Sequence, residues 1–122
     1  MHHSEQRQWP TARKQRPDPR VSMHPDTAVA LGIADGDWVQ VATDQGTIRQ
    51  RAHYTERIPP GLADSEHGWW FPERIGSPDA PGDALTANAN VLCSDAPAHC
   101  APGLGSWAQT GLPCRITKEK AP

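Results

Sequence analysis

The sequence of 122 residues has no long apolar run. A helix that spans a membrane needs ~18 or more consecutive apolar residues, whereas the apolar stretches here are only a few residues long. The polar residues 1–8 also lack the apolar region of a secretory signal peptide. We therefore expect no direct contact with a membrane.

The chain also lacks a large excess of either charge. Twelve Lys and Arg stand against fourteen Asp and Glu, which gives a net charge of -2 at pH 7. This balance produces no overall field that would attract nucleic acid, so we expect no nucleic-acid partner, and any anion site must be local. Cysteine is scarce as well, and the odd number of cysteines, Cys93, Cys100 and Cys114, favours reduced thiols over a disulfide framework.

The common fingerprints of nucleotide loops and of nucleophilic enzymes are missing. There is no Gly-x-x-x-x-Gly-Lys-Ser/Thr loop, no Gly-x-Gly-x-x-Gly after a strand, no Gly-x-Ser-x-Gly elbow and no Cys-x-x-Cys. Cys93, His99 and Cys100 could supply three metal ligands, but structural zinc needs four ligands at closer pairings. The residues therefore predict neither a catalytic group nor a metal ligand.

Glycine and proline are what the chain has in excess. Ten glycines and thirteen prolines exceed the average share of these residues but stay below the level of low-complexity chains. This composition argues against a helix bundle and favours an all-β or loop-rich fold with many short strands. The length suits a single domain.

Local patterns place the elements of this fold. Residues 1–20 are basic and proline-rich, which predicts an extended arm. Pro25 suits the first position of a helix and Gly32 can end it, so a two-turn helix is expected between them. Alternating residues predict a hairpin of two strands, at 38–43 and 47–54. A short strand is expected at 62–65 and a closing strand at 113–117.

Arg49, Arg51 and His53 share one face of the hairpin. Side chains on such a face repeat at ~7 Å, close to the spacing of phosphates in single-stranded nucleic acids. We interpret this face as a solvated sheet face, because the aromatic stacking platform of single-strand binders is missing.

The stretch from His67 to Asn90 predicts a long loop, and loops of this length in a compact domain are usually functional. Three adjacent aromatics, Trp69, Trp70 and Phe71, cannot all face one core from a loop. They either contact a ligand or partner or close the end of a barrel, and the residues alone leave both open. Asn90 carries an amide of the kind that bonds heterocycle edges, although Asn is also a common turn former.

Eight segments combine into a family resemblance. They are His3-Ser4-Glu5-Gln6-Arg7-Gln8, Pro10 with Arg13, Arg16 to Pro19, Met23 to Val39, Glu66 to Glu73, Asn88 to Leu92, Gly105-Ser106-Trp107 and Leu112-Pro113-Cys114. In this order and spacing they resemble the C-terminal, molybdopterin-dinucleotide-binding domain of the dimethyl sulfoxide reductase family of molybdenum and tungsten enzymes. They are most similar to the branch with thiosulfate and polysulfide reductases and acetylene hydratase.

The resemblance implies an all-β fold with short helices, a six-stranded double-psi β-barrel. Residues 1–20 would be a cofactor-wrapping arm, residues 21–117 the barrel and residues 118–122 a disordered tail. The implied cofactor is one molybdopterin guanine dinucleotide, which is part of a bis-form with Mo or W in the full enzyme and is expected to be absent from the isolated chain.

The resemblance also implies which residues meet this cofactor. The opening segment would wrap the pyranopterin and phosphates, and it consists of His3, Ser4, Glu5, Gln6, Arg7 and Gln8. Asn90 would contact the pterin, and His67, Trp69 and Trp70 would face the cofactor. Gly111 and Leu112, with Thr110 beside them, would approach it from the last loop. Cys93 departs from the family pattern, which usually has Thr there.

Family enzymes carry the metal ligand and the iron-sulfur cysteines in earlier domains, none of which is in this sequence. We therefore expect a fragment of an oxidoreductase that is catalytically inactive alone. Its partners would be the remaining domains of the parent enzyme and an iron-sulfur electron-transfer subunit. The expected location is the cytoplasm, or the periplasm if the parent carries a twin-arginine signal.

Two alternatives from other classes stay open. One is a free-standing double-psi barrel that binds a protein or peptide. The other is a pyruvoyl-dependent decarboxylase on the same fold, which would need self-cleavage at Gly76-Ser77 or Gly105-Ser106.

Overall fold

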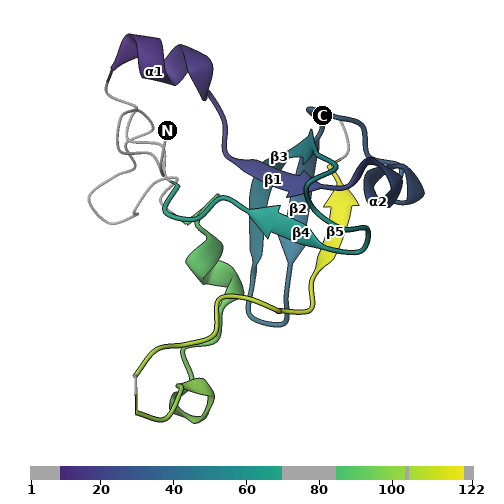
Figure 1. The fold of residues 1–122 in the computed structure, drawn as a ribbon. Helices are drawn as coiled ribbons and strands as arrows, with labels where there is room; N and C mark the ends of the chain where they lie inside the picture. Colours follow the sequence, from purple (N-terminus) through teal and green to yellow (C-terminus); the bar gives the residue numbers. More distant parts are fainter. Residues whose placement is uncertain (1–8, 70–84, 104, 120–122) are drawn as a thin grey trace.

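The fold is one mixed β-sheet with a few short helices around it (Figure 1). The computed structural model describes residues 9–69, 85–103 and 105–119. In chain order the elements are α1 (Pro10–Gln15), β1 (Arg20–Met23), α2 (Pro25–Ala30), β2 (Trp38–Ala42), β3 (Thr47–Tyr54), β4 (Ala63–Ser65), the 3-10 helices η2 (Ala89–Leu92) and η3 (Pro97–His99), and β5 (Arg115–Lys118). This content confirms the expected all-β class. No helix among these residues is long and apolar enough to cross a membrane.

The five strands of the described residues form an open sheet in the order β4-β1-β3-β2-β5. The longest strand, β3, lies at the centre, where it pairs antiparallel with β2 and parallel with β1. The outer strands β4 and β5 are both antiparallel to their neighbours. The predicted hairpin and the predicted short strand at β4 are thus confirmed.

The apolar core covers one face of this sheet. Cross-strand partners point to the same face, and the buried pairs Val39 with Gln50 and Val41 with Ile48 stand directly opposite each other. The period-two alternation of the hairpin therefore predicted which side chains are inside. The rest of the core comes from β1, α2 and the residues after it, β3, η2 and β5, and comprises Val21, Met23, Ala28, Ile33, Ala52, Leu92 and Ile116.

The predicted short helix is α2, and it begins and ends where the sequence indicates. Pro25 occupies the first turn, and the ring nitrogen Nδ1 of His24 accepts a hydrogen bond of 3.1 Å from the amide of Asp26. Gly32 follows with a φ of 68°, the left-handed conformation that terminates helices.

The N-terminal segment is more structured than the predicted extended arm. Residues 10–15 form α1 and Arg20 begins β1, a strand that the sequence did not indicate. Its position depends on distant partners, because the amide of Arg51 donates to the carbonyl of Pro19 at 2.8 Å and that of Glu66 to the carbonyl of Arg20 at 2.9 Å. Such tertiary contacts leave no local signal.

The C-terminal strand is shifted relative to the predicted strand at 113–117, since it starts two residues later and ends one residue later. β5 begins at Arg115 and includes Lys118, which was expected in a disordered tail. The ammonium group of Lys118 lies 2.7 Å from Oδ2 of Asp37, and the amide of Glu119 donates to the carbonyl of Trp38 at 2.9 Å. Both contacts tie the end of the chain to β2. Residues 120–122 lie outside the described part of the chain.

The 3-10 helix η2 is docked on the turn of the hairpin. The hydroxyl of Thr43 donates to the carbonyl of Leu92 at 2.9 Å. Gly46 comes so close to Val91 that a Cβ there would lie 2.6 Å from Val91 Cγ1 and 2.7 Å from its carbonyl oxygen. Glycine is therefore required at this position by a close approach of two backbones.

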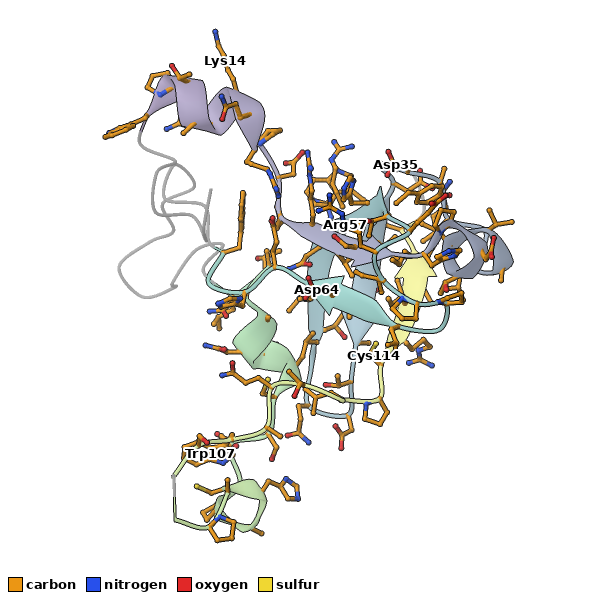
Figure 2. The ribbon with its side chains drawn as sticks, viewed as in Figure 1. Lys14, Asp35, Arg57, Asp64, Trp107 and Cys114 are labelled. Atoms are coloured by element: carbon orange, nitrogen blue, oxygen red, sulfur yellow. The ribbon has the colours of Figure 1, made fainter. Side chains whose placement is uncertain are left out.

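Residues 94–103 and 105–107 stand away from the sheet, with Trp107 at the end of the second range (Figure 2). The indole N–H of Trp107 donates to the carbonyl of Ala96 at 3.0 Å, and Cys100 forms an isolated β-bridge with Trp107. These contacts join the two ends of this segment to each other.

We predict that Gly46→Ala destabilises the fold by ~1–3 kcal/mol, because the added methyl group overlaps a backbone carbonyl that η2 holds in place. Urea unfolding of both proteins measures the difference. Gln45→Ala, at an exposed position of the same turn, is the matched control and should be nearly neutral. Equal stability of Gly46→Ala and the unsubstituted chain would contradict the described contact.

We also predict that Asp37 contributes acid-sensitive stability. The hydrogen bond from Lys118, and then that from the amide of Ala34, lowers the pKa of the Asp37 carboxyl. A lowered pKa stabilises the fold above the ordinary pKa of aspartate, and this contribution is lost as the pH falls through the lowered value. Urea unfolding should therefore show Asp37→Asn less stable at pH 7 and the difference shrinking below pH ~4. A difference that is constant over this range would contradict the assignment, and Asp44→Asn in the exposed turn is the control.

Candidate functional site

Two loops that are far apart in the sequence meet beside the first half of β3. The β4 loop comprises residues 66–69 and follows β4, whereas the η2 loop comprises residues 86–90 and leads into η2. Trp69 of the first and Ala87 of the second are both buried and pack together in a small cluster of their own. The loops carry three of the residues that were expected to meet a cofactor, namely His67, Trp69 and Asn90.

The carboxamide of Gln50 on β3 holds both loops. This side chain is fully buried (0% exposed). Its Nε2 donates to the carbonyl of Glu66 at 2.9 Å and to that of Ala87 at 3.3 Å, and its Oε1 accepts from the hydroxyl of Ser65 at 3.0 Å. A buried polar group with all these bonds made is strongly positioned, because leaving any of its partners unpaired is costly.

The η2 loop presents the amide of Asn90 to the surface. The side chain of Asn88 caps η2 by accepting a hydrogen bond of 3.0 Å from the amide of Asn90, and Leu92 anchors the helix in the core. The carboxamide of Asn90 is exposed and makes no hydrogen bond to the residues that the structure describes. It is therefore a donor and an acceptor on a fixed backbone.

The β4 loop separates its two expected site residues. His67 is exposed, whereas Trp69 is 1% exposed and packs inward against Ala87. The ring of Trp69 thus supports the loop from within and is not part of the exposed surface. Trp70 and the segment His3 to Gln8 lie outside the described residues.

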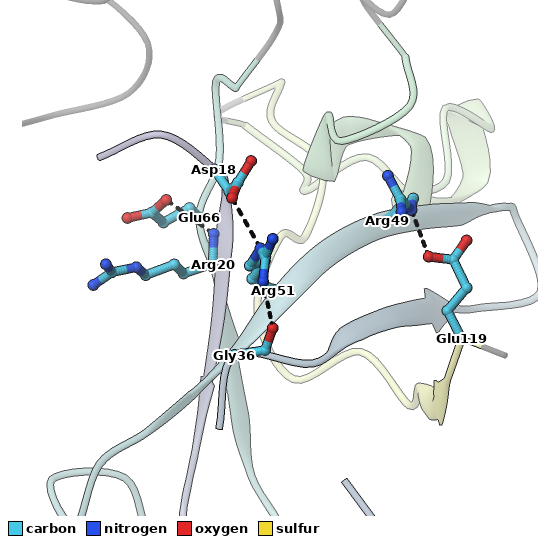
Figure 3. A network of polar contacts seen from close by, with 7 residues as sticks. All are labelled: Asp18, Arg20, Gly36, Arg49, Arg51, Glu66 and Glu119. Carbon is cyan, nitrogen blue, oxygen red and sulfur yellow. Dashed lines mark hydrogen bonds and ion pairs between the residues drawn. The ribbon is translucent and has the colours of Figure 1, made fainter. Parts of the chain in front are cut away.

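Charged side chains anchor the N-terminal chain beside the β4 loop (Figure 3). The carboxylate of Glu66 pairs with the guanidinium of Arg16 and accepts a hydrogen bond of 3.0 Å from the amide of Arg20. Arg51 pairs with Asp18 at 2.8 Å. These contacts bring the chain that precedes β1 to the residue immediately before His67.

The arginine row of β3 is not the plain solvated face that we expected. The guanidinium carbons of Arg49 and Arg51 lie 3.9 and 4.8 Å from the ring centroid of Trp38 on the neighbouring strand. Arg49 also pairs with Glu119 at 2.6 Å. The ring of Trp38 is thus covered by two guanidinium groups and offers no free stacking platform, and the row is engaged in contacts within the protein.

The last expected group belongs to the segment that leads into β5. Thr110 and Gly111 are exposed and Leu112 is half-buried, and no described hydrogen bond joins them to the β4 loop or the η2 loop. Cys93, at the position where Thr is usual, donates its S–H weakly to the carbonyl of Ala89 at 3.7 Å and so braces η2 itself.

The potential metal ligands are not gathered into a site. No group of three or more His, Cys, Asp or Glu that could hold a metal occurs among the described residues. His99 Nδ1 lies 2.7 Å from the hydroxyl of Ser94, and all three cysteines are free thiols.

A shallow hollow of about 570 Å³ lies at the ends of β2 and β5. It is lined by Ala42, Thr43, Asp44, Pro113, Cys114 and Arg115. None of these residues belongs to the site that the sequence predicted.

Sequence reasoning missed three residues that support the two loops, namely Gln50, Glu66 and Arg16. A signal for Gln50 exists, because it is a polar residue at an inward position of an alternating strand, between Ile48 and Ala52. Glu66 and Arg16 give no comparable signal, since their pairing depends on the fold.

Comparison with known proteins decides the family. Residues 1–106 match the family model of the molybdopterin dinucleotide-binding domain. The chain belongs to this family. Among solved structures, acetylene hydratase from Pelobacter acetylenicus resembles the chain with a TM-score of 0.77 and 27% identity, over 95% of this chain and 16% of that one.

Curated relatives are much longer proteins. Dopamine dehydroxylase of Eggerthella lenta is 44% identical over 71 residues, which cover 58% of this chain and 7% of that protein. Acetylene hydratase of Syntrophotalea acetylenica is 35% identical over 85 residues, which cover 68% of this chain and 12% of that protein. The chain thus corresponds to about a tenth of the length of the relatives that it matches.

The contacts of Arg49 lead to a stability prediction. Arg49→Ala removes a guanidinium stacked on Trp38 and a half-buried ion pair with Glu119, so we expect a loss of ~1 kcal/mol in the free energy of unfolding. Urea unfolding measures it, with Arg115→Ala at an exposed position of β5 as the control. An unchanged stability for Arg49→Ala would restore the interpretation of a merely solvated face.

Proposed function

We propose that this domain binds molybdopterin guanine dinucleotide across the β4 loop and the η2 loop, as the cofactor-binding part of a larger molybdenum or tungsten oxidoreductase. The observation that carries the proposal is the exposed carboxamide of Asn90, held on a capped helix next to the loop that bears His67. Membership of the molybdopterin dinucleotide-binding family supplies the identity of the ligand.

The donor set of this surface fits a pterin. A carboxamide offers two donor hydrogens and one acceptor oxygen, which match the mixed donor and acceptor edge of a pterin ring. The Asn90 amide has no partner to give up among the described residues, and Asn88 already fixes the backbone that carries it. Binding would therefore need little further ordering of the protein at this point.

The other assignments follow from the family resemblance and stay part of the proposal. His67 would meet the cofactor directly, and Trp69 would contribute by holding the β4 loop from within. Further contacts would come from Trp70, from Gly111 and Leu112 with Thr110, and, around the pyranopterin and phosphates, from His3, Ser4, Glu5, Gln6, Arg7 and Gln8.

The anchoring of the N-terminal chain supports the last of these assignments. Arg16 and Arg20 fix the chain to Glu66, immediately before His67. The chain from Arg16 to Arg20 therefore lies beside the β4 loop, and residues 3–8 precede it in the sequence. We propose residues 1–20 as the cofactor-wrapping segment and residues 21–117 as a six-stranded double-psi barrel, to which the five-stranded sheet would belong.

When bound, the cofactor supplies a molybdenum or tungsten centre for redox chemistry. The residues of this chain bind and orient the dinucleotide, while the metal ligand of the protein and any iron-sulfur cluster would come from other domains or a partner subunit. The relatives are long enough to hold such further domains. They include the dimethyl sulfoxide/trimethylamine N-oxide reductase of Rhodobacter capsulatus, 38% identical over 73 residues.

The proposal predicts that Asn90→Ala lowers cofactor content without affecting folding. The bound ligand would bury the amide of Asn90, and loss of one such hydrogen-bonding group costs ~1–3 kcal/mol. The parent enzyme should therefore hold less metal per chain when cofactor supply is limiting. The fold should persist because the side chain of Asn90 is exposed and its backbone bond to Asn88 remains. Elemental analysis of molybdenum and tungsten gives the occupancy, and circular dichroism checks the fold.

Gln40→Ala, an exposed amide on β2, is the matched control and should leave metal content unchanged. Full occupancy of the Asn90→Ala enzyme under limiting supply would place the dinucleotide on another part of the domain.

A further inference from the structure

The carboxamide of Gln50 directly connects the two loops that the proposed function assigns to the cofactor. It contacts Glu66 at the start of the β4 loop and Ala87 at the start of the η2 loop. We infer that Gln50 is a positioning residue: it sets the spacing between the two loops and thereby the affinity for the dinucleotide. This inference rests on the proposed function and adds to it a buried residue that does not touch the ligand.

The chemistry of the three contacts selects glutamine. The carbonyl oxygens of Glu66 and Ala87 can only accept hydrogen bonds, so the amide nitrogen must face them, and the amide oxygen then faces the hydroxyl of Ser65. Leucine at this position would leave all three groups without these partners. Glutamate would place a carboxylate oxygen against two carbonyl oxygens.

Among the described residues, no backbone hydrogen bond joins the β4 loop directly to the η2 loop. The β4 loop continues from β4, which pairs with β1 at one edge of the sheet. The η2 loop is held separately, by the bond of 2.7 Å from the amide of Arg49 to the carbonyl of Thr86. Each loop is therefore attached to a different strand, and the side chain of Gln50 bonds both.

Stability and dinucleotide affinity distinguish a structural role of Gln50 from a positioning role. Loss of stability alone weakens the whole sheet and leaves dinucleotide affinity intact under conditions where the protein stays folded. Loss of positioning opens the β4 loop and the η2 loop locally and weakens affinity, even at temperatures far below unfolding.

The test compares Gln50→Leu and Gln50→Glu with two controls in the 122-residue chain. Gln40→Leu removes an exposed amide from β2, and Ile116→Ala weakens the core at β5, the sheet edge opposite β4. Hydrogen exchange measures local opening of residues 66–69 and 86–90. The isolated chain is not expected to retain its cofactor, so molybdopterin guanine dinucleotide is supplied in excess, and amide chemical shifts during the titration measure its affinity for each folded variant.

We expect both Gln50 variants to speed exchange in the two loops and to weaken dinucleotide affinity at least tenfold, as loss of ~1.4 kcal/mol would do. Ile116→Ala should lower the unfolding midpoint but keep the affinity, and Gln40→Leu should change neither. If either Gln50 variant fails to fold, the other carries the comparison.

Unchanged affinity in a folded Gln50 variant, with binding intact in the unsubstituted chain, would overturn the positioning role and leave the proposed function standing. Affinity lost equally in Ile116→Ala would also overturn it, because the effect would then follow stability. An unsubstituted chain whose amide shifts do not respond to the dinucleotide would instead count against the proposed function, and the inference would fall with it.

Discussion

The central strand β3 needs hydrogen-bond partners along both edges, and this requirement organises the molecule. One edge is filled by β2. On the other edge β1 pairs only from Arg51 onward, so the first half of the strand meets the η2 loop, where Arg49 donates to Thr86. Buried backbone amides seldom stay unpaired. A segment distant in sequence is thereby drawn to the sheet at the point where β1 begins.

The candidate site is assembled on this frame by side chains that the sheet positions. Gln50 reaches from β3 to both loops, and Glu66 binds the chain that leads into β1 through Arg16. The exposed groups, above all the amide of Asn90, then project from a well-bonded base. This division between buried support and exposed contact suits a domain that binds and orients a cofactor whose metal chemistry is completed elsewhere.

The elements that depend on neighbouring residues alone could be predicted from the sequence. The hairpin follows from its alternation, and α2 follows from Pro25 and Gly32. The strand β1 and the partners of Glu66 could not be predicted, because they arise from contacts between distant segments. The contact between Trp38 and Arg49 could not be predicted for the same reason, since only the register of β2 against β3 brings the two together. The contact of Asn90 with the cofactor comes from the family pattern and stays a prediction. The buried Trp69 has a structural role, which is one of the two alternatives that the residues alone left open for the aromatics.

A crystal structure of the full-length protein, purified with its cofactor bound, tests the central claim most directly. Our account predicts that the carboxamide of Asn90 lies within hydrogen-bond distance of the pterin and that the β4 loop contacts the same ligand. It also predicts that Gln50 stays bonded to Glu66 and Ala87. A dinucleotide bound at the hollow near Cys114, with neither loop in contact with it, would contradict the account.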